Sequence, residues 1–185
     1  MLQPPHITEF FIHTKIRPGA TVIDATAGNG YDTEKLCRAV GETGRVYAFD
    51  IQQLALEETK KRLEAGGFLN ATLILDSHSS MDCYVKEPVD AVLFNLGYLP
   101  GGDHTLQTKA ETTIEAIEKS LALLSDEGFI SVTVYYGKNS GCEEKNAVMA
   151  YFKTLDHKKY TVLACDFYNR PNNPPITVIL TKNKS

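Results

Sequence analysis

The chain has 185 residues, of which 43% are hydrophobic and 23% charged, and this size and composition fit one compact domain over residues 1–185. Its formal net charge of −4 argues against a dedicated nucleic-acid-binding protein, although a local basic patch can still hold a small RNA element. No stretch approaches the roughly 20 apolar residues that span a bilayer, and Met1–Phe11 lacks the layout of a signal peptide, so we expect a cytoplasmic protein.

Seven apolar, β-rich segments are predicted to be strands. The run Ala91–Phe94 is continuously apolar, which is typical of strands buried on both faces of a helix-covered parallel sheet. In chain order the predicted strands are Thr21–Asp24, Arg45–Asp50, Ala71–Leu75, Val89–Asn95, Phe129–Tyr136, Thr161–Tyr168 and Ile176–Thr181.

Helices are predicted between the strands. The clearest covers Lys109–Leu124, where apolar residues recur at helical spacing and Thr108 with Glu111 forms a capping-box pattern. A second covers Gln52–Ala65 and is expected to end at Gly66–Gly67, because glycine readily takes the left-handed conformation that ends a helix.

The connection between the last two predicted strands sets the topology. Only Asn169–Pro175 separates them, which is too short for the crossover helix that parallel strands need. We therefore predict an α/β, Rossmann-like fold with a seven-stranded, mostly parallel sheet, an antiparallel last strand and helices on both faces. This layout resembles that of class I methyltransferases.

A glycine-containing loop follows the first strand. Gly28 and Gly30 let the backbone turn tightly and let a ligand approach the main chain, although such a pair can also be a purely structural turn. Dinucleotide-binding loops have a third glycine where this chain has Thr33. Asp24 and Asp32 would repel a pyrophosphate but complement the ammonium and sulfonium groups of S-adenosylmethionine. The loop therefore favours S-adenosylmethionine as the cofactor.

Further polar residues follow the second and third strands. Asp50 can accept hydrogen bonds from ribose hydroxyls, as the equivalent acid does in NAD enzymes. Asp76 and Ser77 stand where a side chain commonly faces the adenine edge, although Asp76 alone could be a solvated turn residue. The predicted cofactor-binding residues are Asp24, Thr26, Gly28, Asn29, Gly30, Asp32, Asp50, Gln52, Asp76, Ser77, His78 and Asn95.

The segment Phe94–His104, after the fourth strand, carries a candidate substrate site. Ligands of open α/β sheets bind outside the carboxyl ends of the strands. Asn95 and Tyr98 keep the spacing of the [D/N]-P-P-[Y/F] loop of amino-group methyltransferases, although Leu96–Gly97 replaces the two prolines. In that loop an oxygen accepts a hydrogen bond from the target amine, and the aromatic ring stacks on the base.

Four motifs together resemble one family. They are DATAGNGYD at residues 24–32, NLGYLPGGDH at 95–104, YYG at 135–137 and NNPP at 172–175. The chain is similar, over nearly its whole length, to the bacterial proteins labelled putative rRNA methylases, whose members include the tRNA 5-aminomethyl-2-thiouridine methyltransferase of Gram-positive bacteria. Lys138 stands where we expect family members often to carry histidine, which puts any role for an imidazole there in doubt.

The resemblance implies transfer of a methyl group from S-adenosylmethionine, leaving S-adenosylhomocysteine, to the exocyclic amine of an aminomethylated wobble uridine in the tRNA anticodon. No metal is needed. Asn95 and the carbonyl of Leu96 would orient the amine, Tyr98 would pack on the base, and Asp103 or His104 would take the proton. A loop-ordering hydrogen bond is an equally good explanation of His104.

Residues on neighbouring loops complete the predicted substrate side. Tyr135 and Tyr136 can stack on a base or serve as core aromatics, and basic side chains, Lys109 included, could hold phosphates. The run Lys60–Arg62 is better explained as a solvated helix face. The predicted substrate-binding residues are Leu96, Gly97, Tyr135, Tyr136, Lys138, Arg170, Asn172 and Asn173.

The cysteines and the other histidines give no metal or redox pattern. Cys37, Cys83, Cys142 and Cys165 form no C-x-x-C pair, and we expect reduced, mostly buried thiols. Metal-ligand spacing is likewise absent from His6, His13, His78 and His157. The sequence leaves open the oligomeric state, a homodimer included, and what the segment Pro4–Lys15 covers.

Three other functions would use some of the same residues. An NAD-dependent oxidoreductase would share Gly28, Gly30 and Asp50 but would need the third glycine. A non-catalytic binding module would predict a damaged cofactor loop, whereas this loop is intact. A methyltransferase acting on rRNA or on a small amine is the main alternative, because the motif around Asn95 indicates an amine more directly than it indicates a polymer.

Overall fold

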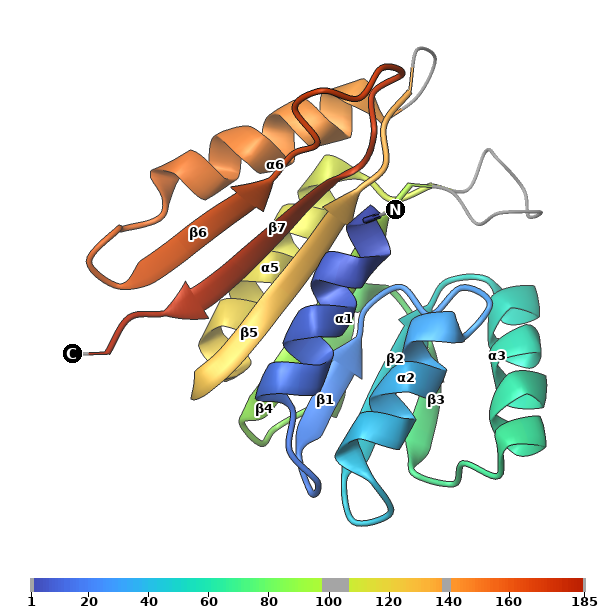
Figure 1. Cartoon of the computed structure of the whole chain (residues 1–185). Helices are drawn as coiled ribbons and strands as arrows, with labels where there is room; N and C mark the ends of the chain where they lie inside the picture. Colours follow the sequence, from blue (N-terminus) through green and yellow to red (C-terminus); the bar gives the residue numbers. More distant parts are fainter. Residues whose placement is uncertain (1, 98–106, 138–140, 185) are drawn as a thin grey trace.

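The computed structural model describes residues 2–97, 107–137 and 141–184. These residues form a seven-stranded sheet with the order β3-β2-β1-β4-β5-β7-β6 (Figure 1). The strands are β1 (Thr21–Asp24), β2 (Arg45–Asp50), β3 (Ala71–Leu75), β4 (Val89–Leu96), β5 (Leu124–Val134), β6 (Tyr160–Cys165) and β7 (Ile176–Lys182).

The pairing of the strands confirms the predicted mixed sheet. β1 to β5 pair in parallel, and β7 runs antiparallel to both β5 and β6. β1 lies between β2 and β4, so the order of the strands reverses beside it. Open α/β sheets bind their ligands at the carboxyl ends of the strands at such a reversal.

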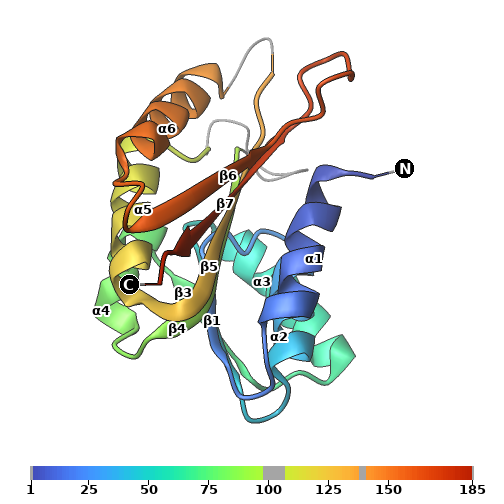
Figure 2. The same ribbon diagram turned by 60° about the vertical axis from the view of Figure 1, so that its left-hand side comes forward.

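Helices cover both faces of the sheet, as predicted (Figures 1 and 2). One face carries α1, α2 and α3, and the other carries α4, α5 and α6. The helices are α1 (Pro4–Lys15), α2 (Tyr31–Val40), α3 (Gln53–Gly66), α4 (Met81–Tyr84), α5 (Ala110–Leu123) and α6 (Cys142–Thr154), with a 3₁₀ turn at His78–Ser80 before α4.

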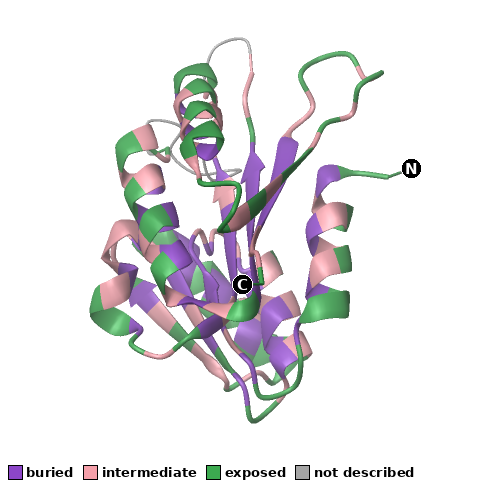
Figure 3. Ribbon diagram, turned by 90° about the vertical axis from the view of Figure 1, so that its left-hand side faces the viewer, coloured by how far each residue is buried: buried purple, intermediate pink, exposed green. Residues whose placement is uncertain are grey.

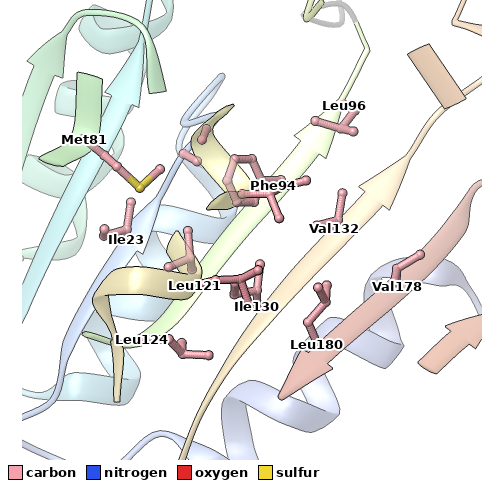
Figure 4. Close-up of a cluster of buried hydrophobic side chains, with 14 of the residues drawn as sticks. Ile23, Met81, Phe94, Leu96, Leu121, Leu124, Ile130, Val132, Val178 and Leu180 are labelled. Carbon is pink, nitrogen blue, oxygen red and sulfur yellow. The ribbon is translucent and has the colours of Figure 1, made fainter. Parts of the chain in front are cut away.

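The central strand β4 shows why the sheet is buried on both sides. Phe94 and Leu96 point into the cluster beneath α4, α5 and α6, while Leu93 points into the cluster beneath α1 and α2. Figure 4 shows the first cluster, and Figure 3 shows that buried residues follow the sheet and the inner faces of the helices. Each fully buried leucine or phenylalanine contributes roughly 1.5–3 kcal/mol relative to an exposed one. This rigid sheet holds the loops at its carboxyl edge.

The N-terminal segment Pro4–Lys15, whose role the sequence left open, is the helix α1. It packs against β5 and β7, where the Thr8 hydroxyl lies 2.9 Å from that of Ser131 and the rings of Phe11 and Phe129 lie 5.6 Å apart. α1 therefore covers β5 and β7, and a predicted substrate loop lies beside each of these strands.

Some predicted boundaries differ from the structure. β5 begins at Leu124, five residues before the predicted start at Phe129, because the turn-like residues 125–128 are in fact extended. It ends at Val134, so Tyr135 and Tyr136 lie beyond the strand. β6 ends at Cys165 and not at Tyr168.

One of the two predicted helix ends is confirmed. α3 ends at Gly66, and Gly67 takes the left-handed conformation with a φ of 71°. The predicted capping box of α5 is wrong, because Lys109 is the N-cap residue and no side chain caps it. The hydroxyl of Thr108 instead accepts the backbone N–H of Gly97 and donates to Glu144.

The cysteines are free, but the expectation that most of them are buried is wrong. Only Cys37 is buried, while Cys83 and Cys142 are exposed and Cys165 is partly exposed. Within the described ranges, no helix has both the length and the apolar character to cross a membrane.

Candidate active site

A cavity of about 1200 Å³ opens at the carboxyl edge of the parallel strands, the upper edge in Figure 1. Its walls come from the loops after β1 to β5 and from the loop between β6 and β7. The predicted site residues that line it are Thr26, Gly28, Asn29, Asp32, Asp50, Gln52, Asp76, Ser77, His78, Asn95, Leu96, Gly97, Tyr135, Tyr136 and Asn173.

Four predicted residues in the described part of the chain do not line the cavity, and four more lie outside that part. Asp24 and Gly30 are buried beneath the cavity, and Arg170 and Asn172 lie in the loop between β6 and β7. The other four, Tyr98, Asp103, His104 and Lys138, lie outside the described residues.

The glycine loop is pressed against α3. Gly28 and Gly30 have positive φ angles of 52° and 78°, and a Cβ added to Gly30 would lie 2.9 Å from the Cα of Thr59. The hydroxyl of Thr59 donates to the carbonyl of Gly28 at 2.9 Å. Glycine at position 30 is thus required both by the backbone conformation and by the close approach of α3.

Asp50 braces the same loop from β2. One carboxylate oxygen accepts the backbone N–H of Gly28 and the other that of Gln52, each at 2.9 Å. Burial raises the pKa of Asp50, and the backbone hydrogen bonds oppose this rise. Each carboxylate oxygen has a second lone pair, so Asp50 can also accept hydrogen bonds from a ligand in the cavity.

Asp24 lies beneath the loop and is not among the residues that line the cavity. It is fully buried, accepts the hydroxyl of Thr33 at 2.6 Å and accepts the backbone N–H of Thr26 at 3.2 Å. Burial, with a smaller contribution from the charge of Asp32, raises the pKa of Asp24 to about 7. The side chain therefore fixes the shape of the loop, whereas Asp32 lines the cavity.

Asn95 has a fixed orientation at the end of β4. Its backbone N–H donates to the hydroxyl of Thr26 at 2.7 Å, and its side-chain Nδ2 donates to Oδ2 of Asp32 at 2.9 Å. An ionised carboxylate can only accept hydrogen bonds, so the Asn95 atom facing it must be the nitrogen. The amide oxygen of Asn95 is consequently available as an acceptor.

Two residues that the sequence analysis missed extend this hydrogen-bond chain to α1. Nζ of Lys35 lies 3.0 Å from Oδ1 of Asp32 and 2.8 Å from Oε1 of Glu9. The i, i+3 spacing of Asp32 and Lys35 on α2 was a usable signal. Glu9 gave none, because only the folded chain brings α1 next to α2.

The loop after β3 forms another wall. Asp76 accepts the backbone N–H of Ser77 at 2.7 Å and the hydroxyl of Tyr84, which the sequence analysis missed, at 2.9 Å. His78 is buried, its ring lies nearly perpendicular to that of Phe94, and its Nε2 has no hydrogen-bond partner within the described part of the chain. Burial lowers the pKa of His78, which favours the neutral imidazole, and Nε2 is an unpaired polar atom of a residue that lines the cavity.

Thr108 is hydrogen-bonded to Gly97, within the predicted substrate loop. Its backbone N–H donates to the carbonyl of Gly97 at 3.1 Å, and its hydroxyl accepts the N–H of Gly97 at 2.9 Å. The same hydroxyl donates to Oε2 of Glu144 at 2.6 Å, and Thr113 donates to Oε1 at 2.8 Å. The buried carboxylate of Glu144 thus ties the ends of the loop to α5 and α6.

Comparison with known proteins identifies the family. The sequence profile of the family described as Putative rRNA methylase matches residues 46–181, well over half of the chain. The chain belongs to this family. The resemblance inferred from the four motifs is thereby confirmed.

Individual relatives cover most or all of the chain. The chloroplastic tRNA (mnm(5)s(2)U34)-methyltransferase of Arabidopsis thaliana is 37% identical over 181 residues, which cover 92% of this chain but only 66% of the plant protein. Two crystal structures match 99% of both chains. One is a putative rRNA-methylase of Clostridium thermocellum (45% identity, TM-score 0.97), and the other is a putative methyltransferase of Streptococcus mutans in complex with S-adenosylhomocysteine (38% identity, TM-score 0.91). These matches confirm the class I methyltransferase fold.

Proposed function

We propose that the chain is an S-adenosylmethionine-dependent RNA methyltransferase. Its acceptor in this proposal is the exocyclic amine of 5-aminomethyl-(2-thio)uridine at the wobble position of tRNA. The tRNA methyltransferase activity of the Arabidopsis relative and the S-adenosylhomocysteine in the Streptococcus structure support this proposal. The observation that carries the amine as acceptor is the fixed amide of Asn95.

The residues around the glycine loop fit the proposed cofactor. Asp50 offers acceptors suited to ribose hydroxyls, and the neutral His78 offers an unfilled nitrogen in the next wall. Asp32 lines the cavity with a carboxylate that complements a cationic methionine end. When bound, S-adenosylmethionine supplies an electrophilic methyl group on sulfur. The absence of a third glycine and the presence of these acids disfavour a pyrophosphate.

The protein's main task is to position the acceptor. The amide oxygen of Asn95 can accept one N–H of the amine, which leaves the nitrogen lone pair free to point towards the cofactor half of the cavity. Alignment of reacting groups can supply up to roughly 7–11 kcal/mol of a barrier. Asp32 holds the amide in place, and Tyr135 and Tyr136 offer aromatic surface to the base.

The protonated form of the alkyl amine must lose one proton before the nitrogen lone pair can attack the methyl group; the carbon–sulfur bond then breaks and a secondary ammonium ion is formed. Asp103 and His104 stay the predicted acceptors, and both lie outside the described residues. A primary alkyl amine becomes a good nucleophile once it is deprotonated, so no metal is required by this chemistry.

An acceptor comparison tests the proposal. The purified chain is incubated with methyl-labelled S-adenosylmethionine and, in parallel, with tRNA that carries the aminomethyl group, with ribosomal RNA, and with small primary amines. The proposal expects label in the tRNA alone. Label in ribosomal RNA or in the small amines would replace the tRNA substrate by the corresponding alternative, whereas absence of label from every acceptor would contradict the methyltransferase activity.

A further inference from the structure

The loop between β6 and β7, residues 166–175, projects beyond the carboxyl edge of the sheet (Figure 2). Tyr168 on this loop is fully exposed, which makes it the most exposed large hydrophobic residue of the described chain. Asn172 and Asn173 have left-handed backbone angles, with φ values of 66° and 49°. Single exposed aromatic rings are common on protein surfaces, so the surroundings of Tyr168 decide what it does.

The loop is built onto the mouth of the cavity. Asn173 and Pro175 line the cavity itself. Arg170 donates a hydrogen bond to the carbonyl of Leu2, just before α1. These contacts hold the loop, and the exposed ring that it carries, beside the substrate half of the site.

Two cations lie over aromatic rings on this side of the cavity. The guanidinium carbon of Arg170 is 3.9 Å from the ring centroid of Phe167, and Nζ of Lys145 is 4.7 Å from that of Tyr136. Such stacking holds each cation near the mouth while leaving its charge available to a ligand. We call Phe167, Tyr168, Arg170, Tyr136 and Lys145 the aromatic rim.

The size of the cavity requires a surface of this kind if the substrate is a polymer. A volume of about 1200 Å³ is close to the roughly 300–1000 Å³ of pockets that bind small molecules, so the cavity is too small to enclose a polymer. The nucleotides on either side of the methylated one must therefore leave across the mouth. Exposed rings suit unpaired bases, and nearby cations suit phosphates.

We propose that the aromatic rim is a docking surface for unpaired RNA, with Tyr168 stacking on a base next to the methylated nucleotide. This inference rests on the proposed RNA substrate. The combination of rings with cations favours single-stranded RNA over a duplex, because paired bases are not free to stack on a side chain. Both cations attract the backbone, whatever its sequence, so the rim adds affinity without reading the bases.

Binding of a labelled RNA hairpin to the full chain tests the rim. The hairpin carries the sequence of an anticodon stem and loop, and a fully paired duplex of equal length is the comparison ligand. Tyr168→Ala should weaken hairpin binding by about 5-fold to about 150-fold, the range for loss of one stacked base, and should leave duplex binding unchanged. Tyr168→Phe should restore binding, because the ring alone is needed.

Leu69→Ala is the matched control. Leu69 is 96% exposed like Tyr168 but precedes β3, at the opposite edge of the sheet. Hairpin affinity, cofactor affinity and thermal stability should all stay at wild-type values in this variant. Tyr168→Ala should also keep wild-type cofactor affinity and thermal stability, so that its loss of hairpin affinity is not explained by misfolding.

The outcomes separate the rim from the proposed function. If the wild-type chain methylates tRNA while Tyr168→Ala and Leu69→Ala bind the hairpin with equal affinity, the docking role of the aromatic rim is wrong and the proposed RNA substrate stands. If the wild-type chain binds no RNA and methylates no tRNA, the proposed function fails and the rim with it. If Tyr168→Ala instead alters self-association and leaves hairpin binding intact, the surface serves a second copy of the chain and the RNA assignment is wrong.

Discussion

The raised pKa of Asp24 makes the free energy of unfolding depend on pH. Its pKa is raised from 3.8 to about 7 in the folded chain, first by burial and then by the charge of Asp32. Because the folded state keeps a proton that the unfolded state loses between these values, stability is fully present below about pH 4 and is lost as the pH rises through 7. Each pKa unit corresponds to 1.36 kcal/mol, so the whole effect is about 4 kcal/mol.

Asp24→Asn removes this dependence while keeping the size of the side chain. The asparagine oxygen can accept the N–H of Thr26, and its amide nitrogen can donate to the rotated hydroxyl of Thr33. Most of the shifted range lies between pH 5 and pH 8. Over that interval the wild-type protein should therefore lose about 3 kcal/mol of unfolding free energy relative to the variant.

Urea unfolding at a series of pH values between 5 and 8 measures this difference. Asp126→Asn is the control, because it removes the same charge at an exposed position and should leave the profile parallel to that of the wild type. Parallel profiles for wild type and Asp24→Asn would refute the argument, since they would mean that Asp24 is ionised in the folded protein throughout this range.

Four further substitutions test separate parts of the site. Asp50→Ala should weaken cofactor binding measured by calorimetry by roughly tenfold or more, since hydrogen bonds to a charged group are worth roughly 1.5–3 kcal/mol; an unchanged dissociation constant would remove its role. Asn95→Ala should lower the rate of methyl transfer by roughly 100-fold with little change in cofactor affinity. An equal loss of affinity and rate in this variant would place Asn95 in the cofactor half of the cavity. Asp32→Asn should also lower the rate of methyl transfer, because it releases the amide of Asn95. Gly30→Ala should destabilise the chain by roughly 1–3 kcal/mol in thermal unfolding, and an unchanged melting temperature would show that the contact with Thr59 relaxes freely.

The parallel core of the fold could be predicted from local sequence. β1, β2 and β3 have the predicted bounds, because each is an apolar run that ends at a polar or glycine-containing turn. The beginning of β5 was missed since residues 125–128 have the composition of a turn while extending the strand. The helix α1 went unassigned because its pattern is weak, with only Pro4, Thr8 and Ile12 buried.

The site, too, was predictable in part. The loops that carry the cavity were predictable, because in a parallel sheet the carboxyl ends of all strands meet at one edge. The surroundings of Asp24 were not, since only the fold shows that it is fully buried and accepts hydrogen bonds from Thr33 and Thr26. Nor could the sequence show that Lys35 joins Asp32 to Glu9, because that contact brings together two helices.

The central claim is that the methyl group is transferred to the amine of the wobble uridine. Its most direct test is mass spectrometry of nucleosides from tRNA that carries the aminomethyl group, after incubation with the purified chain and S-adenosylmethionine, with Asn95→Ala in parallel. The account predicts that the methylaminomethyl nucleoside appears with the wild-type chain at the expense of the aminomethyl one, and far more slowly with the variant. Methylation of any other nucleoside, or an unchanged aminomethyl nucleoside despite measurable cofactor binding, would contradict it.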